Sequence, residues 1–277
     1  MTANAQDADD WNGASGRHFV EQRVRWERMR SRMTTRLLAA AQIGDGDEVL
    51  DVGCGCGDTT ILAARACGSG HALGADISRI EIAEARRLAA TEGVANADFE
   101  VIDVQTHPFK AADFDVALSC FGVMFFDDAT AAFGNVRTAL RRGGRFAFLC
   151  WRARAENPYF GFGYAATAVE LGMCEDPGPD EAFSLADKRR VVAMLAATGF
   201  GDIAATAVDE PMQLGRSVDD VLQYERTYAS AQRVLTGLAP ERAEQLDRRV
   251  RDRMAPYVSQ DGVVFPGAAW LVTARAV

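Results

Sequence analysis

The chain has no long hydrophobic runs. No stretch of its 277 residues approaches the roughly 20 consecutive apolar residues that a membrane-spanning helix needs. The N-terminus also lacks the basic-then-apolar order of a secretory signal, since Asp7, Asp9 and Asp10 stand there. We therefore expect a soluble, cytoplasmic protein that makes no membrane contact.

The chain also has fewer basic than acidic residues. Lysine and arginine number 30 against 39 acidic residues, which gives a net charge of −9 and an isoelectric point near 5.0. A surface that neutralises many phosphates needs the opposite balance, so the composition disfavours nucleic acid as a partner. The length suits one large α/β core with an added cap, or two small domains.

Cysteines are too few for a disulfide framework. The chain has six, without an export signal, and we expect them to be reduced. Cys54 and Cys56 are close enough in sequence to suggest a metal-binding pair, but no second Cys or His pair stands at ligand spacing. We predict no metal site here and expect the two thiols to fill a tight turn.

The most informative segment present runs from Val49 to Thr60, VLDVGCGCGDTT. An apolar strand ends in Asp51, three alternating glycines follow, and a helix begins at Asp58. Glycines let backbone N–H groups approach a ligand, and a helix start presents unpaired N–H groups at its positive end. Asp51 can accept hydrogen bonds from an ammonium group. The segment therefore predicts a site for a charged, nucleotide-like cofactor.

The glycine spacing separates two candidate cofactors. The dinucleotide fingerprint Gly-x-Gly-x-x-Gly places a glycine where this chain has Asp58, whose charge would repel a pyrophosphate. S-adenosylmethionine fits better, since it carries an ammonium for Asp51 and a carboxylate for the glycine loop. At these residues the chain resembles the class I methyltransferases that use S-adenosylmethionine. An NAD-dependent oxidoreductase is the less favoured alternative.

Later strands extend the resemblance. Asp76 ends the second strand, 19 residues after Gly57, where an acid can chelate both ribose hydroxyls. Asp103 ends the third strand and resembles the family's clamp on the adenine edge. Open α/β sheets bind ligands at the carboxyl ends of their strands, which is where these acids fall. The predicted strands after the first span residues 72–78, 99–104, 114–119, 142–151, 203–208 and 269–274.

The alternation of strands and helices predicts a doubly wound, mostly parallel, seven-stranded α/β sheet of Rossmann-like type with helical cap insertions. Helices are expected at 15–42, 58–67, 78–92, 129–140, 187–198 and 217–257, and a Pro/Gly loop at Pro177–Pro179. The expected parts are an N-terminal helical arm (1–42), the cofactor-binding core (43–151), a lid insertion (152–185), more of the core (186–210), a helical cap insertion (211–262) and the final core strand (263–277).

The resemblance implies a set of cofactor contacts. Trp11 lies in the arm that family members fold over the cofactor, and Ser119 ends the fourth strand. The expected cofactor residues are Trp11, Asp51, Gly53, Cys54, Gly55, Thr59, Asp76, Ile77, Asp103, Val104 and Ser119.

Substrate specificity is expected in the cap, because the connections that leave the carboxyl edge of the sheet carry binding residues. The many aromatic residues there suit a planar or apolar small molecule, although each could instead pack the cap against the sheet. The expected acceptor contacts are Phe19, Phe121, Met124, Tyr224 and Tyr228.

Methyl transfer from a sulfonium is an in-line displacement, so positioning can supply most of the catalysis. Where the acceptor must lose a proton, His18 is the best placed of the three histidines, three residues before Glu21 in the arm helix. A His18–Glu21 pair could act as a base with an orienting carboxylate, and Tyr224 or Tyr228 could complete a relay. The alternative is a solvated helix face that bears both residues by chance.

The segment Ser119-Cys120-Phe121-Gly122 bears on the acceptor. It differs from the Asn/Asp-Pro-Pro-Tyr/Phe of enzymes that methylate amines of nucleic-acid bases. The likeness is instead to the small-molecule group of quinone-biosynthesis and natural-product enzymes, in which carbon, nitrogen and oxygen atoms accept methyl groups. A noncatalytic cofactor-binding protein is a further alternative, and the helices around 217–257 could form a homodimer contact or only a lid.

Overall fold

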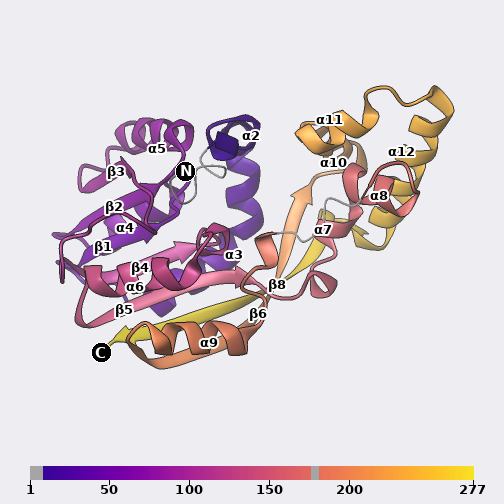
Figure 1. Cartoon of the computed structure of the whole chain (residues 1–277). Helices are drawn as coiled ribbons and strands as arrows, with labels where there is room; N and C mark the ends of the chain where they lie inside the picture. Colours follow the sequence, from indigo (N-terminus) through magenta and orange to yellow (C-terminus); the bar gives the residue numbers. More distant parts are fainter. Residues whose placement is uncertain (1–8, 176–180) are drawn as a thin grey trace.

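The protein is built around one sheet. The computed structural model describes residues 9–175 and 181–277, so the expected loop at Pro177–Pro179 lies outside the described residues (Figure 1). The strand order is β3-β2-β1-β4-β5-β8-β6, with β7 paired to β8. The strands are β1 Glu48–Val52, β2 His71–Asp76, β3 Ala97–Val101, β4 Phe114–Cys120, β5 Leu140–Trp151, β6 Phe200–Gly215, β7 Val258–Ser259 and β8 Gly262–Ala276.

The predicted α/β class is confirmed, but the strand count is wrong. The described residues form eight strands instead of seven. The additional strand, β7, has two residues and forms a short hairpin with β8. Two residues are too few to show the period-two alternation by which a strand is recognised in a sequence.

Strands β1 to β5 run parallel, and β8 runs antiparallel to both β5 and β6. Their carboxyl ends therefore meet at one edge of the sheet. The helices are α2 Ala14–Glu21, α3 Arg23–Ala41, α4 Asp58–Ala66, α5 Arg79–Glu92, α6 Ala129–Ala139, α7 Tyr159–Phe162, α8 Tyr164–Glu170, α9 Lys188–Ala197, α10 Val218–Glu225, α11 Ala229–Leu235 and α12 Pro240–Met254.

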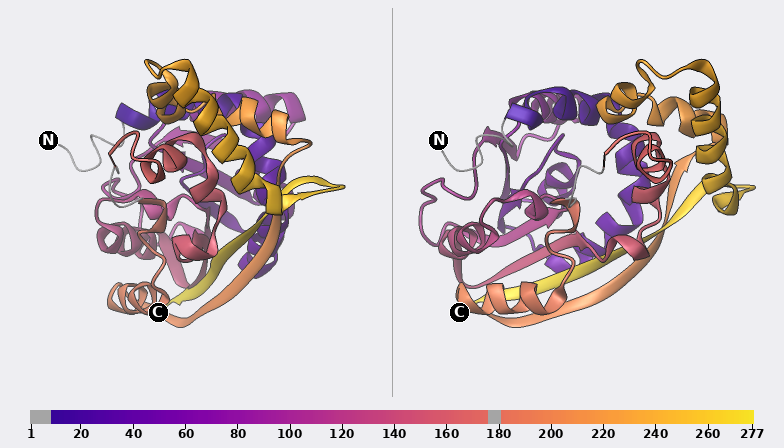
Figure 2. Two further views of the ribbon diagram at one scale, coloured as in Figure 1. Left: turned by 90° about the vertical axis from the view of Figure 1, so that its right-hand side faces the viewer. Right: turned by 45° about the vertical axis from the view of Figure 1, so that its right-hand side comes forward.

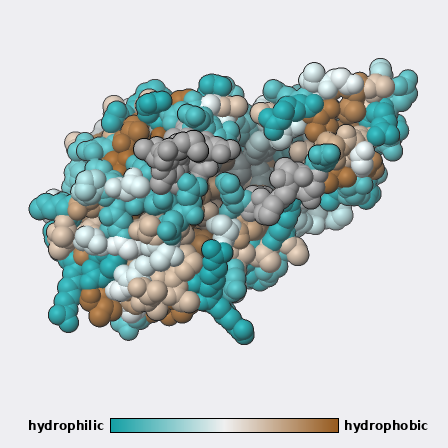
Figure 3. Space-filling view, viewed as in Figure 1, coloured by the Kyte–Doolittle hydropathy of each residue, from teal (hydrophilic) through white to brown (hydrophobic). Residues whose placement is uncertain are grey.

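Hydrophilic residues cover most of the face seen in Figure 3. Within residues 9–175 and 181–277, no helix combines the length and the apolar character that crossing a bilayer requires.

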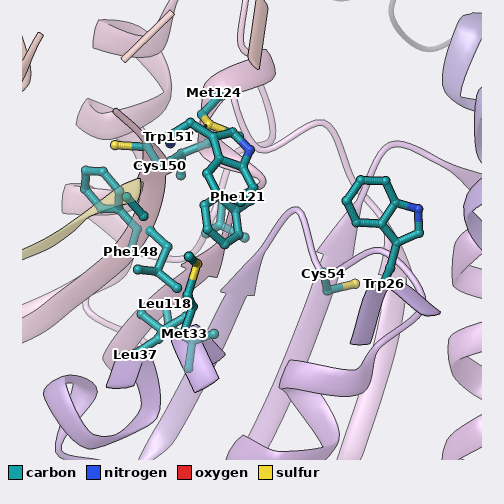
Figure 4. Packing of buried hydrophobic residues seen from close by; sticks show 14 of the residues in the cluster. Trp26, Met33, Leu37, Cys54, Leu118, Phe121, Met124, Phe148, Cys150 and Trp151 are labelled. Carbon is teal, nitrogen blue, oxygen red and sulfur yellow. Dashed lines mark hydrogen bonds between the residues drawn. The ribbon is translucent and has the colours of Figure 1, made fainter. Parts of the chain in front are cut away.

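The core lies between α3 and the central strands. Met33 and Leu37 of α3 are fully buried and lie beside Leu118 of β4 and Phe148 of β5 (Figure 4). Strands covered on both faces read as continuous apolar runs, which explains why the sequence predicts them clearly. Truncating Leu37 to alanine would cost about 2–5 kcal/mol of stability, because close-packed interiors collapse only partly around a cavity.

Strands β6 and β8 extend far beyond the core as a two-stranded ribbon. They have 16 and 15 residues, whereas strands were expected only at 203–208 and 269–274. The ribbon leads to the cap helices α7, α8, α10, α11 and α12 (Figures 1 and 2). Pro211 pairs with Pro266 in the extension. Proline argues against a strand in a sequence, but this rung places both residues without N–H donors opposite each other.

Candidate functional site

A cavity opens at the carboxyl ends of β1, β2 and β4, beneath the helices of the N-terminal arm. Ten of the eleven expected cofactor residues line it, all except Ser119. Three of the five expected acceptor contacts also line it, namely Phe19, Phe121 and Met124. His18, Glu21, Tyr224 and Tyr228 lie outside its lining.

Asp51 presents an open acceptor at this cavity. Its carboxylate is fully buried, and Oδ2 accepts a hydrogen bond from the Thr60 hydroxyl at 2.7 Å. Within the described part of the chain, Oδ1 has no hydrogen-bond partner. Burial raises the pKa of Asp51 to about 7. An uncompensated buried carboxylate is costly, so a positively charged ligand group would stabilise the ionised form.

The glycine loop needs its glycines for two reasons. Gly53, Gly55 and Gly57 have positive φ angles of 65°, 53° and 84°, which side chains rarely adopt. A Cβ on Gly53 would also lie 2.8 Å from the Cα of Gly122, the second residue after β4. The loop then enters α4 through Gly57, whose lack of a side chain leaves the first-turn N–H groups uncapped.

Asp76 ties the loop to the next strand. Its Oδ2 accepts from the Gly55 N–H and its Oδ1 from the Ser78 N–H, both at 2.8 Å. Burial raises the pKa of Asp76, while these backbone donors act in the opposite direction. Each carboxylate oxygen can accept a second hydrogen bond, so the group can still receive two hydroxyls.

The arm is attached directly beside Asp76. The Ser78 hydroxyl donates to the Trp11 carbonyl at 2.9 Å, and the Asn12 amide donates to the Ile77 carbonyl at 3.2 Å. The Trp11 ring packs edge-on against Phe125 at 5.2 Å between centroids. Trp11 therefore covers the cavity from the arm.

Asp103 and Ser119 differ in whether they line the cavity. Asp103 lines the cavity and accepts from the Gln105 N–H at 3.0 Å and the Thr106 hydroxyl at 2.8 Å. Ser119 does not line the cavity, which corrects its expected place. Its hydroxyl is fully buried and accepts from the Gly122 N–H at 3.2 Å. Successive strand residues face opposite sides, so Cys120 lines the cavity in its place.

Two arginines of α3 enter the lining and were missed from the sequence. Arg23 forms an ion pair with Asp58 and approaches Glu84 at 3.8 Å. The Arg30 Nε donates to the Trp26 carbonyl at 3.3 Å, and its guanidinium makes no ion pair with the described residues. Arginines on an amphipathic helix are usually solvated, and nothing local marks these two as inward-facing. Arg30 therefore places a guanidinium that forms no ion pair with the described residues near Asp51.

Two pairs of stacked aromatic side chains also line the cavity. Phe121 stacks on Trp151 at 4.1 Å, and Phe19 stacks on Trp26 at 4.9 Å. Phe121 has a positive φ of 66°, a strained conformation for an aromatic residue. Figure 4 shows Phe121, Trp151 and Met124 together, with Trp26 and Cys54 on the other side of the view. Trp26 and Trp151 were not among the expected acceptor contacts.

Residues 49–144 match the family model of a methyltransferase domain, from β1 to the start of β5. This part of the chain thus matches a methyltransferase domain. Its curated relatives include aklanonic acid methyltransferase DauC of a Streptomyces species, 38% identical over 117 residues, which are 42% of this chain and 53% of that protein. The O-methyltransferase resE of Aspergillus sclerotiorum is 31% identical over 53% of this chain and 54% of its own. The chain spans about half the length of these relatives.

Solved structures share the fold of this chain. The YcgJ protein of Bacillus subtilis aligns with a TM-score of 0.59 and 20% identity, over 89% of this chain and 98% of its own. Geranyl diphosphate C-methyltransferase of Streptomyces coelicolor aligns with a TM-score of 0.52 and 18% identity, over 91% and 82%. At such identities the likeness concerns the fold alone.

The residues of the methyltransferase domain fit S-adenosylmethionine, the cofactor of this class. The unpartnered Oδ1 of Asp51 suits its ammonium. The guanidinium of Arg30 forms no ion pair with the described residues, although it lies over the Trp26 ring at 5.6 Å, and it suits the carboxylate. Asp76 keeps acceptor capacity for the ribose. Asp58, which was expected to repel a pyrophosphate, is paired with Arg23.

The expected His18–Glu21 pair is not formed. The Glu21 side chain is exposed, whereas His18 is buried and its Nδ1 lies 3.2 Å from the Thr227 hydroxyl. The His18 ring packs on Tyr228 at 4.0 Å between centroids. Residues three apart lie about 60° apart around a helix, and here only His18 faces the cap. Burial lowers the pKa of His18 to about 4.

The tyrosines near His18 form a separate buried cluster between the arm and the cap. The Tyr159 hydroxyl lies 3.0 Å from that of Tyr228 and 3.3 Å from that of Tyr224. Burial raises the pKa of all three phenols. Tyr159 contacts Trp26 edge-on at 6.0 Å, so the cluster supports the cavity wall from behind. The proposed relay through Tyr224 or Tyr228 has no path along the cavity lining.

The cysteines of the loop remain thiols. Cys54 and Cys56 are buried and free, and burial raises the pKa of both. Among the residues placed by the structure, no cluster of three or more His, Cys, Asp or Glu has an arrangement that could hold a metal ion.

Proposed function

We propose that this protein transfers the methyl group of S-adenosylmethionine to a small aromatic or apolar molecule. The observation that carries this proposal is the mixed lining of the cavity. It combines the unpartnered Asp51 oxygen, the glycine loop and Asp76 with stacked aromatic rings. Such a cavity combines an anchor for a charged cofactor with an apolar surface for an acceptor.

The cofactor supplies a methyl group bonded to a positively charged sulfur, which is a good leaving group. Asp51 would accept hydrogen bonds from the ammonium, Arg30 and the loop N–H groups would bind the carboxylate, and Asp76 would bind the ribose. Asp103 and the Val104 N–H would hold the adenine edge, and Trp11 would exclude water from the arm side. Holding the acceptor in line at contact distance supplies most of the rate, since the aligned geometry removes an entropic barrier.

The names of the relatives support a small acceptor. One is named for aklanonic acid and the other as an O-methyltransferase. We propose a role in the tailoring of natural products on this basis.

An assay with labelled S-adenosylmethionine tests the proposal. The purified protein is incubated with phenols, indoles, amines and quinones, and transfer of label is measured. We expect transfer to at least one class, with Asp51→Asn strongly impaired and the exposed-site variant Asp98→Asn unimpaired. Binding of S-adenosylhomocysteine without transfer to any class would instead indicate a noncatalytic binding protein.

A further inference from the structure

The aromatic part of the cavity lining comes from separate elements. Phe121 and Trp151 are stacked with their planes 22° apart, and Phe19 and Trp26 with theirs 19° apart. Phe160 meets Trp151 edge-on at 5.4 Å. Ring faces and edges of this kind pack best against a planar molecule.

One polar atom in this wall is buried without a partner. Trp26 is 8% exposed, and its indole nitrogen makes no hydrogen bond with the residues that the structure describes. Indole N–H is a donor only, and a buried donor without an acceptor is unfavourable. An oxygen atom of the acceptor would satisfy it.

Among the described residues that line the cavity there is no His, Lys or Tyr that could deprotonate an acceptor, and the sequences 1–8 and 176–180 contain none of these residue types either. The carboxylates of the lining follow β1, β2 and β3, on the side assigned to the cofactor. His18 is held by Thr227 and Tyr228 behind the wall. An acceptor that arrives already ionised needs no such base.

Building on the methyl transfer proposed above, we propose that the acceptor is a planar aromatic compound that presents an ionised oxygen, either a carboxylate or an acidic phenolate. A lone pair of this oxygen forms the new O–CH₃ bond while the methyl–sulfur bond breaks and its electron pair stays on sulfur. No proton moves. The negative charge of the acceptor and the positive charge of the sulfonium cancel in the products, and apolar surroundings favour a step in which opposite charges cancel.

Acceptors of graded acidity test the inference. The pH dependence of kcat/KM is measured with phenol, 4-chlorophenol, 4-nitrophenol and benzoate. We expect the midpoint of each phenol profile to follow that phenol's own pKa, by about one pH unit for each unit of pKa, and benzoate to show no midpoint near neutrality. A single midpoint shared by all acceptors would indicate an enzymic base and overturn the inference. Preferential methylation of aniline or indole would also overturn it.

A pair of tryptophan variants supplies an independent readout. Trp26→Phe keeps a ring but removes the donor, so KM for the favoured oxyanion should rise about tenfold while the Kd of S-adenosylhomocysteine is unchanged. Trp270→Phe is the matched control, since its indole donates to the Ala186 carbonyl at 2.8 Å outside the cavity. An unchanged KM in Trp26→Phe contradicts the assigned contact. Cofactor binding with no transfer to any acceptor would instead overturn the proposed function, and this inference with it.

Discussion

Asp51 links cofactor binding to stability at the scale of a single residue. Burial raises its pKa from 3.8 to about 7, so the folded protein holds this proton more tightly than the unfolded chain does. The stabilising contribution of the group therefore declines as the pH rises from about 4 to about 7, by up to about 4 kcal/mol. Ligand-free protein thus contains a carboxyl whose ionisation is unfavourable until a positive group arrives.

Replacing Asp51 by asparagine should reveal the free-energy cost of ionising this buried carboxyl. The variant retains an acceptor for the Thr60 hydroxyl but cannot ionise. We expect its Tm relative to the wild type to increase between about pH 5 and pH 8, because only the wild type must ionise a buried group. Thermal unfolding across that range, with Asp98→Asn as the exposed control, measures the effect. A difference in Tm that does not vary with pH contradicts the raised pKa.

His18 should matter for stability more than for turnover. It is neutral at pH 7, packs against Tyr228 and lies outside the cavity lining. We expect His18→Ala to lose about 2–3 kcal/mol of stability through the space it leaves, with kcat reduced less than tenfold. Glu21→Ala, an exposed change on the same helix, is the control. A loss of 10²-fold in kcat with an unchanged Tm would restore the catalytic-base hypothesis.

The glycine loop is the element on which cofactor binding depends most. In Gly53→Ala the new Cβ meets Gly122 at 2.8 Å in addition to the strain of a positive φ. Gly143→Ala is a close control, since Gly143 also has a positive φ but nothing lies within 4 Å of its Cβ position. We expect both variants to lose about 1 kcal/mol through strain. Only Gly53→Ala should lose binding of S-adenosylhomocysteine in a calorimetric titration, and equal binding by the two variants would count against the role of the loop.

The sequence predicts elements that adjacent residues encode better than elements that depend on pairing between distant residues. Strand β1 and the start of α4 are encoded by adjacent residues. The apolar run, the glycines and the start of the helix can therefore be recognised together in one short segment of sequence. The extension of β6 and β8 depends on pairing between residues about 50 positions apart, such as Gln213 and Val264. Its prolines and charged residues resemble a loop until the partner strand is considered.

The residues of the site also divide into those that the sequence predicts and those that it does not. Asp51, Asp76 and Asp103 are found from sequence because each stands at or just beyond the end of a strand, and a parallel fold gathers strand ends at one edge. Arg30 and Trp26 reach the cavity only because α3 crosses that edge, which the spacing of residues within the helix does not specify. His18 shows the converse, since its helix position was predicted but its partner in the cap was not.

At the scale of the whole molecule, the cavity is closed by stretches of chain far apart in the sequence. The arm supplies Trp11, Phe19 and Trp26, and the segment after β5 supplies Phe160. Arg25 of the arm joins the cap directly, since it pairs with Asp220 at 2.6 Å and lies over the Tyr224 ring. The cap helices thus hold the arm in place from outside and leave the chemistry to the strand ends.

Calorimetric titration with S-adenosylhomocysteine, with NADH as the comparison, tests the central claim most directly. The open oxygen of Asp51 and the guanidinium of Arg30 predict one-to-one binding of S-adenosylhomocysteine, weakened about 10- to 100-fold in Asp51→Asn through loss of a charge-assisted contact. NADH should give no saturable heat. Binding of NADH, or no binding of S-adenosylhomocysteine by the wild-type protein, would contradict the account.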